Sequence, residues 1–285
     1  MTYFLDLRAQ PVGGSVSSYV KVWADDMLLD AAGIPGLVQG QDVLLATHGF
    51  NVDDADGRHA LGAWESLLTL SGTVYLAVLW PGDSSWALGL DYPFEGNVAI
   101  ESAKLLASFI DATMSGASSI SFASHSLGAR LLLQTAKLSK RKFRRAVIMA
   151  GAIDDNCLAG EYAGAAANFE SISILASKSD EVLELAFPLG NFLGGILTKD
   201  SPYWHGALGR FGPNGTPPAG VSIHAHWQLP DSWGYGHHNY LPGNPVPPKR
   251  ATPEDVPPQD TPTPPDFPLG TSSWSAAVAS TRLEP

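Results

Sequence analysis

The pentapeptide Ser124-His125-Ser126-Leu127-Gly128 carries the sharpest chemical signal in the sequence. A nucleophilic serine at a tight, strained turn needs a strand before it, a helix after it and small residues two positions away on either side. Gly128 meets the downstream requirement, and Ser124 is small enough to stand in for the more usual upstream glycine. The pattern predicts that Ser126 is a nucleophile, although a serine-rich turn in which Ser126 only caps the helix would look the same.

A second loop could supply the electrostatic part of the same chemistry. It is the segment THGFN (47–51), which follows an earlier apolar run. When a serine attacks an ester carbonyl, backbone N–H groups can hold the charge that develops on the oxygen. One donor usually belongs to the residue after the nucleophile, here Leu127, and the other to a loop after an early strand. Because Gly49 lets the backbone approach a substrate, we assign Phe50 as the second donor, and we interpret His48 as a brace of the loop.

An acid and a base follow later in the chain, each beyond a further apolar run. Asp180 comes just after SISILAS (171–177), and His237 lies in GHHNY (236–240), after the last such run. The order Ser126, Asp180, His237 is that of nucleophile, acid and base in enzymes with this kind of turn. Asp180 alone could simply cap a helix, but the combination predicts a Ser-His-Asp triad.

Two neighbouring residues are alternatives for these roles. Asp154 follows the apolar run 144–152, and some enzymes of this kind take their acid from that earlier strand. Adjacent residues of an extended segment point in different directions, so only one of His237 and His238 can face the serine. The preceding Gly236 gives the loop room to bend, which favours His237.

Alternating strands and helices must position these residues. Apolar runs of strand length recur between residues 40 and 225, and amphipathic stretches with helical spacing separate them. Such strands, joined by helices, predict right-handed crossovers and a mostly parallel sheet covered on both faces, which is a doubly wound α/β fold. The expected strands lie within 42–50, 73–80, 118–124, 144–152, 171–177 and 221–227, and the expected helices within 55–70, 97–114 and 127–138, with an alanine-rich helix before residue 171.

Composition limits the classes of function. The chain has 285 residues, of which 45% are hydrophobic, so it can bury a sizeable core. A net charge of −11 argues against a nucleic-acid backbone as the main partner. The single cysteine, Cys157, excludes an intramolecular disulfide and a multi-cysteine zinc site. No run approaches the roughly 20 apolar residues of a membrane span, and the first residues lack a secretory signal, so we expect a cytoplasmic protein.

Proline divides the sequence into two parts. Twelve of the 22 prolines lie between Pro242 and Pro285, where proline disfavours both a helix and a central strand. We therefore predict a globular domain over residues 1–241 and a proline-rich tail over residues 242–285. The tail could bind a partner, but a surface segment without a binding role has the same composition.

Three further features carry weaker signals. His224 and His226 share one face of an expected strand and could suggest a metal, but no cysteine cluster or HExxH motif accompanies them. The basic run 140–145 falls between a helix and a strand, away from the proposed chemistry. The apolar, aromatic loop 80–94 could line a substrate pocket or pack in the core. We predict neither a metal nor a cofactor.

Several motifs together resemble a known family. They are THGFN (47–51), LWPGD (79–83), ASHSLGAR (123–130), MAGAIDD (149–155), ASKSDEVLELA (176–186) and GHHNY (236–240). In these pieces the chain is similar to the α/β hydrolases grouped as a family of unknown function whose members carry an HGFN loop. The resemblance covers roughly residues 40–242 of the sequence.

This resemblance implies an α/β-hydrolase fold and a serine hydrolase of the carboxylesterase type, which acts on a small-molecule ester. It places the nucleophile on Ser126, the acid on Asp180, the base on His237 and the oxyanion donors on Phe50 and Leu127. The short segments between the late strands leave room for little or no cap domain. The same triad would serve a lipase, a thioesterase or an acyltransferase, and a non-catalytic hydrolase-fold module that binds a partner is a separate hypothesis. The sequence does not assign an oligomeric state.

Overall fold

The computed structural model describes residues 1–66, 68, 70, 72–83, 92–185, 206–216, 222–229, 231 and 235–240. Some features discussed above lie outside this part of the chain. They are the tail over 242–285, residues 84–91 of the apolar loop, most of the segment between the late strands (186–205), and the side chains of His224 and His226.

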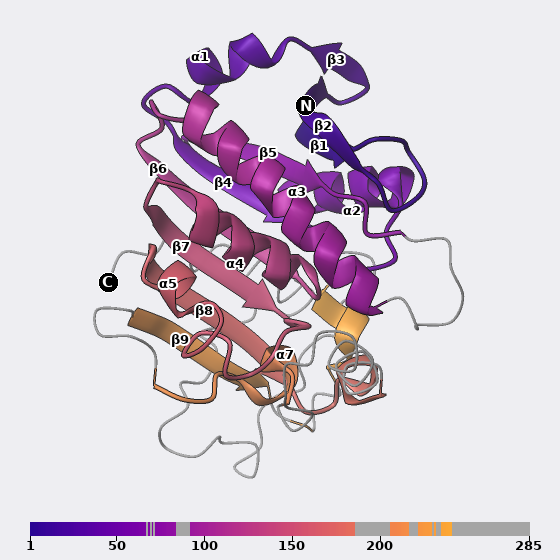
Figure 1. Cartoon of the computed structure of the whole chain (residues 1–285), viewed down its shortest axis with the longest axis vertical. Helices are drawn as coiled ribbons and strands as arrows, with labels where there is room; N and C mark the ends of the chain where they lie inside the picture. Colours follow the sequence, from indigo (N-terminus) through magenta and orange to yellow (C-terminus); the bar gives the residue numbers. More distant parts are fainter. Residues whose placement is uncertain are drawn as a thin grey trace.

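The described strands form one nine-stranded sheet in the order β3-β2-β1-β5-β4-β6-β7-β8-β9 (Figure 1). Neighbours from β1 to β9 pair in parallel, whereas β2 and β3 add an antiparallel edge. This arrangement confirms the mostly parallel α/β fold. The strands are β1 (Tyr3–Arg8), β2 (Val16–Ala24), β3 (Met27–Leu29), β4 (Asp42–Thr47), β5 (Thr73–Leu79), β6 (Ser119–His125), β7 (Phe143–Met149), β8 (Phe169–Ser177) and β9 (Ser222–Leu229).

Helices flank this sheet. The long helices α3 (Tyr92–Thr113) and α4 (Gly128–Leu138) lie side by side across one face, and α2 (Asp54–Ser66) packs against β5 (Figure 1). The remaining described helices are short: η1 (Ala31–Gly33), α1 (Ile34–Val38), α5 (Ala163–Ala166), α7 (Leu208–Phe211) and η3 (His237–Tyr240).

The order of the strands reverses between β4 and β6. The strand that follows β4 in the chain, β5, lies on the side of β4 that faces β1. The strands that follow β6 are added on the opposite side of the sheet. β4 and β6 are parallel neighbours, and Thr47 pairs in register with Ser124, so the loops that follow these strands open side by side. In open α/β sheets the crevice at such a reversal is the usual place for a ligand.

The central strands agree closely with the sequence prediction. Every residue from Val43 to Thr47 and from Ala146 to Met149 is buried, because these strands are covered on both faces and therefore consist of apolar runs. Two expectations were too long. The alanine-rich helix before residue 171 shrinks to the four residues of α5, and the strand expected to reach 152 ends at Met149, where Ala150 takes a positive φ of 46°.

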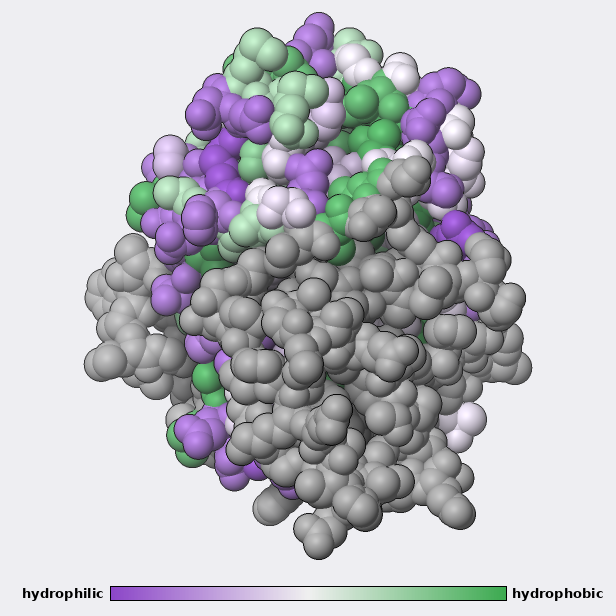
Figure 2. All heavy atoms as spheres, turned by 180° about the vertical axis from the view of Figure 1, so that it is seen from behind, coloured by the Kyte–Doolittle hydropathy of each residue, from purple (hydrophilic) through white to green (hydrophobic). Residues whose placement is uncertain are grey.

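The N-terminal region was not predicted as part of the sheet. Residues 3–29 form β1, β2 and β3, and β1 extends the parallel sheet beyond β5. Hydrophilic and hydrophobic side chains are interspersed over this end of the molecule when it is seen from behind (Figure 2). Exposed apolar residues, Tyr19, Met27 and Leu28, lie among charged residues on its surface. The sequence of this region therefore lacks the continuous apolar runs that mark the central strands.

Candidate active site

Ser126 occupies a strained turn between β6 and α4. Its φ is 54°, a left-handed conformation that is uncommon for a residue with a side chain. The turn is held by backbone hydrogen bonds, because the Ser126 N–H donates to the Met149 carbonyl (3.0 Å) and the Ser126 carbonyl accepts from Ala152 N–H (3.1 Å). Gly128 must lack a side chain, since a Cβ there would lie 2.5 Å from the His48 carbonyl oxygen. The sequence requirement for small neighbours therefore has a direct steric cause.

Ser126 is the first member of a continuous chain of hydrogen bonds. The Ser126 hydroxyl lies 2.8 Å from Nε2 of His237, and Nδ1 of the same ring lies 2.8 Å from Oδ2 of Asp180. A carboxylate accepts hydrogen bonds, so Nδ1 carries the proton and Nε2 is free to accept the hydroxyl proton of Ser126. All three residues are buried, with exposed fractions of 5% for Ser126, 7% for His237 and 0% for Asp180.

Asp180 uses its two carboxylate oxygens differently. Oδ1 accepts the backbone N–H of Leu183 (2.9 Å) and so caps the helical turn that follows β8, while Oδ2 faces His237. The two sequence interpretations of Asp180, as a helix cap and as the partner of a histidine, therefore both describe the structure. The cap fixes the carboxylate in the orientation that the His237 contact needs.

The two alternative residues lie outside this chain of hydrogen bonds. His238 is exposed and its ring only touches His237 edge-on, with 5.5 Å between the ring centres. Partial burial and the neighbouring His237 lower the pKa of His238. Asp154 forms an isolated backbone bridge with Ala207, and the carboxylate that contacts His237 belongs to Asp180.

The loop after β4 packs directly against Ser126. A Cβ on Gly49 would lie 2.6 Å from the Cβ of Ser126 and 3.2 Å from its hydroxyl oxygen, so only glycine fits. Among the described residues, the backbone N–H groups of Phe50 and Leu127 have no hydrogen-bond acceptor. Each of the two loops that meet at the reversal of strand order therefore carries one unpaired backbone donor.

His48 is held by the backbone on both of its ring nitrogens. Nδ1–H donates to the Gly49 carbonyl (2.9 Å), and Nε2 accepts the backbone N–H of Trp80 (3.3 Å). The Trp80 indole N–H in turn donates to the His48 carbonyl (3.0 Å), and the two rings stack. Burial, together with the charge of Arg8, lowers the pKa of His48 to about 3. His48 is therefore a neutral brace of the loop, as interpreted from the sequence.

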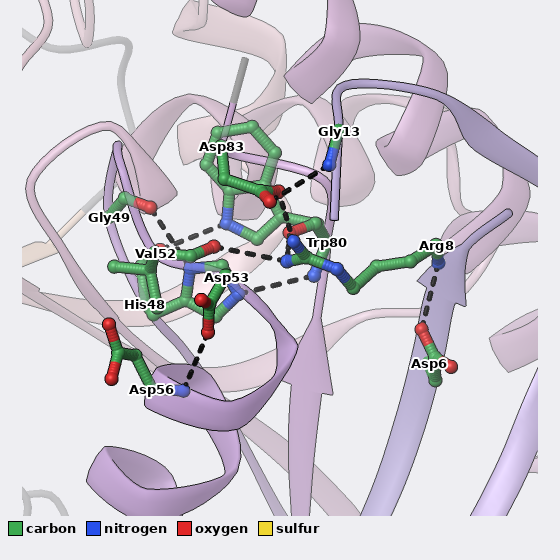
Figure 3. A network of polar contacts seen from close by, with 10 residues as sticks. All are labelled: Asp6, Arg8, Gly13, His48, Gly49, Val52, Asp53, Asp56, Trp80 and Asp83. Carbon is green, nitrogen blue, oxygen red and sulfur yellow. Dashed lines mark hydrogen bonds and ion pairs between the residues drawn. The ribbon is translucent and has the colours of Figure 1, made fainter. Parts of the chain in front are cut away.

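A buried ion pair contacts the same loops (Figure 3). The guanidinium of Arg8, on β1, donates to the carbonyls of Trp80 (2.7 Å) and Val52 (3.1 Å) and pairs with Asp83. Asp83 also accepts the backbone N–H of Gly13 (2.9 Å). The arginine side chain is fully buried. Sequence reasoning missed this pair, and the only available signal was Asp83 within the LWPGD motif.

Other polar residues of interest have different surroundings. Cys157 is buried, and that burial raises the pKa of its thiol far above the usual range, which disfavours the thiolate. The described residues include no cluster of three or more side chains suited to a metal ion. No helix in this part of the chain is long and apolar enough to cross a lipid bilayer.

One family model and several solved structures are similar to this chain. Residues 37–211 match a family model described as "Alpha/beta hydrolase of unknown function (DUF900)". Two solved structures are similar: esterase PE8, with 17% identity over 55% of this chain and 80% of that chain (TM-score 0.36), and a lipase-esterase related protein from Clostridium acetobutylicum ATCC 824, with 14% identity over 49% and 75% (TM-score 0.30). No curated protein matches the chain.

Proposed function

Because the chain belongs to this family of alpha/beta hydrolases of unknown function, we propose that it is a serine hydrolase that cleaves carboxylic esters through an acyl-enzyme. The single observation that carries the proposal is the hydrogen-bond chain Ser126–His237–Asp180, built on a turn with positive φ at the serine. A buried serine that only capped a helix would need neither the imidazole nor the carboxylate behind it.

The proposed reaction begins with the attack of Ser126 on the ester carbonyl. A serine hydroxyl is a weak nucleophile at neutral pH, so Nε2 of His237 takes its proton during the attack. Asp180 holds the Nδ1–H tautomer and stabilises the imidazolium that forms. His237 then protonates the leaving alcohol, and a water activated by the same nitrogen releases the acid. Each step uses groups that the chain itself supplies, so the proposal requires no cofactor.

The N–H groups of Phe50 and Leu127 are the proposed oxyanion donors. Support comes from the close approach of the neighbouring Gly49 to Ser126, from the place of Leu127 directly after the serine, and from the lack of other acceptors for both N–H groups in the described structure. Loss of one such donor typically lowers turnover by about 100- to 1000-fold. The rigid backing of the Phe50 loop by His48, Trp80 and the Arg8–Asp83 pair would keep its donor in place before substrate arrives.

We further propose that residues 1–241 contain all the chemistry and that the tail over 242–285 is dispensable. Every proposed catalytic group precedes Tyr240. A chain that ends near Pro242 should hydrolyse a small activated ester at the rate of the full chain. Lost turnover at an unchanged melting temperature would mean that the tail contributes to the substrate site.

A serine-reactive fluorophosphonate probe, combined with a panel of p-nitrophenyl esters of increasing acyl length, tests the proposed function. Labelling and turnover should both require Ser126, and both should vanish in Ser126→Ala while the melting temperature is kept. The acyl-chain series, extended with a thioester and with an alcohol acceptor, separates a carboxylesterase from a lipase, a thioesterase or an acyltransferase. A folded wild-type chain that is neither labelled nor active would instead be a non-catalytic binding module.

A further inference from the structure

The histidine before the proposed nucleophile makes a contact that the triad itself does not need. Nε2 of His125 lies 2.9 Å from the backbone carbonyl oxygen of His237, which is 112 residues away in the sequence. A carbonyl can only accept, so Nε2 carries the proton and donates it. The two rings lie 4.9 Å apart and are tilted by 54°. His125 thus ties the backbone of the proposed base to the chain that carries the proposed nucleophile.

We propose that His125 is a positioning residue that fixes the backbone of His237 so that its ring reaches Ser126 and Asp180 together. The proposal rests on the proposed function, since it assigns a role to His125 only through the base. In this role His125 acts through the backbone of His237 and touches no substrate. It determines the position of the His237 imidazole ring.

The geometry shows why the base needs such an anchor. Ser126 follows β6 and Asp180 follows β8, so both are attached to the rigid sheet, whereas His237 lies in the short 3₁₀ turn η3. Near the start of this turn, Ser177 on β8 donates its hydroxyl proton to the Tyr235 carbonyl (2.6 Å). The bond from His125 is a further tie, and it acts at the residue whose ring must make two contacts of 2.8 Å.

Two hydrogen bonds close to His237 are local to the turn. The Gly236 N–H donates to the side-chain oxygen of Asn239 (2.7 Å), and the Asn239 N–H donates to the Gly236 carbonyl (3.2 Å). They shape the turn but do not connect it to the sheet. A displacement of about 1 Å at a reacting group can lower a rate by about 100-fold. The bond from His125 therefore opposes movement of the turn as a whole.

The surroundings of His125 keep it in the form that can donate. Its ring is buried, with an exposed fraction of 4%, and burial lowers its pKa well below the ordinary value, with the neighbouring His237 adding to the effect. The neutral ring has one N–H, and this group donates a hydrogen bond to the His237 carbonyl. Nδ1 is then unprotonated and faces the glycine of the other loop, where a Cβ on Gly49 would lie 3.3 Å from it. One neutral histidine therefore fits between both loops of the site.

Substitutions that mimic one ring nitrogen at a time test the proposal. The side-chain amide nitrogen of glutamine can occupy the place of Nε2, whereas that of asparagine is nearer to Nδ1. His125→Gln should therefore keep kcat for ester hydrolysis within about fivefold of wild type. His125→Asn and His125→Phe should lower kcat by about 10- to 100-fold while KM stays within about threefold, because the lost contact is not with substrate.

A second readout does not depend on turnover. The proton on Nδ1 of His237, held against Asp180, should give a downfield NMR signal in the wild type and in His125→Gln, and this signal should be lost or broadened in His125→Asn and His125→Phe. If the wild type hydrolyses no ester, the proposed function fails while the NMR pattern still decides the role of His125. If the wild type is active and the asparagine and phenylalanine variants keep both kcat and the signal, the positioning role is wrong. Equal kcat losses in all three variants that follow their melting temperatures would also overturn it, in favour of a purely structural role.

Discussion

His48 and His237 are both enclosed at the same end of the sheet, and their surroundings are opposite. His237 has a carboxylate on one ring nitrogen and a hydroxyl on the other. His48 has a backbone carbonyl on one nitrogen and a backbone N–H on the other. Nε2 of His48 already accepts a hydrogen bond from a peptide N–H, which does not give up its proton. This nitrogen therefore cannot serve as a base for a reactant. The positive charge of Arg8 also disfavours the protonated form of His48.

Burial and position alone do not distinguish a histidine that can move a proton from one that holds a loop. Both rings are nearly inaccessible, with exposed fractions of 2% for His48 and 7% for His237. What separates them is the pair of atoms bound to the two nitrogens. One arrangement can move a proton between oxygen atoms, and the other can only hold a loop in place.

The largest effect is expected where the proposed proton path is cut. Ser126→Ala, His237→Ala and their double variant should each lose at least about 10,000-fold in kcat, and the losses should not add, because members of a triad act as a unit. Asp180→Asn should cost about 10,000-fold through the wrong tautomer of His237, with Asp154→Asn as the matched control near wild type. Turnover of an activated ester and circular dichroism would be measured for each variant. An inactive Asp154→Asn beside an active Asp180→Asn would move the acid to the earlier strand.

Disrupting the Arg8–Asp83 ion pair should change the stability of the protein more than its activity. Removing one partner of a buried ion pair leaves the other charge uncompensated, so Asp83→Asn should lower the free energy of unfolding by about 3–5 kcal/mol. The double variant Arg8→Met with Asp83→Asn should recover part of this loss. Denaturant titrations would measure it, with Glu101→Gln as the control because its pair with Lys104 is exposed and worth less than about 0.5 kcal/mol. A loss at Asp83 no larger than the control would show that the pair does not stabilise the loops.

The candidate active site and the Arg8–Asp83 pair also differ in how far the sequence could predict them. The strands β4, β6, β7 and β8 are apolar runs because both of their faces are covered, so their pattern is local. The strained turn at Ser126 could be predicted because its steric demands fall on residues two positions away. The pairing of Ser126 with His237 has no such local signal. It was predicted from the order in which the two residues follow their strands, and in the sheet their side chains lie in contact.

The missed features depend on partners that are distant in the sequence. Arg8 lies 75 residues from Asp83, and nothing near either residue shows that both are buried. A charged residue in β1 instead suggests a solvent-exposed face, because an unpaired buried cation would be very costly. The bond from His125 to the His237 carbonyl has no side-chain signature at its acceptor end, since every residue has a carbonyl. Such contacts become visible only once the fold places the loops.

The pH dependence of stability should separate a neutral brace from a protonated one. In the folded chain the pKa of His48 is about 3, below its ordinary 6.5, so between these values the unfolded chain binds a proton that the folded chain does not. The stabilisation by His48 is complete above pH 6.5 and is lost as the pH falls towards 3. Relative to His48→Gln, the wild type should therefore lose about 2 kcal/mol of unfolding free energy between pH 8 and pH 5. Urea titrations at the two pH values measure this gap, and a constant gap would contradict the neutral brace.

The smallest effect is expected at the histidine next to the proposed base. His238 is exposed, and its only described contact with the site is the edge-on approach of its ring to that of His237 at 5.5 Å. Removing it leaves the bonds of His237 to Ser126 and Asp180 in place. His238→Ala should therefore change kcat by no more than about threefold, or roughly 0.7 kcal/mol in the barrier. Ester turnover of His238→Ala and His237→Ala, measured side by side, decides between the two histidines. An inactive His238→Ala beside an active His237→Ala would move the base by one residue, and activity in both would end the contrast with His48, because neither histidine of this turn would then serve as the base.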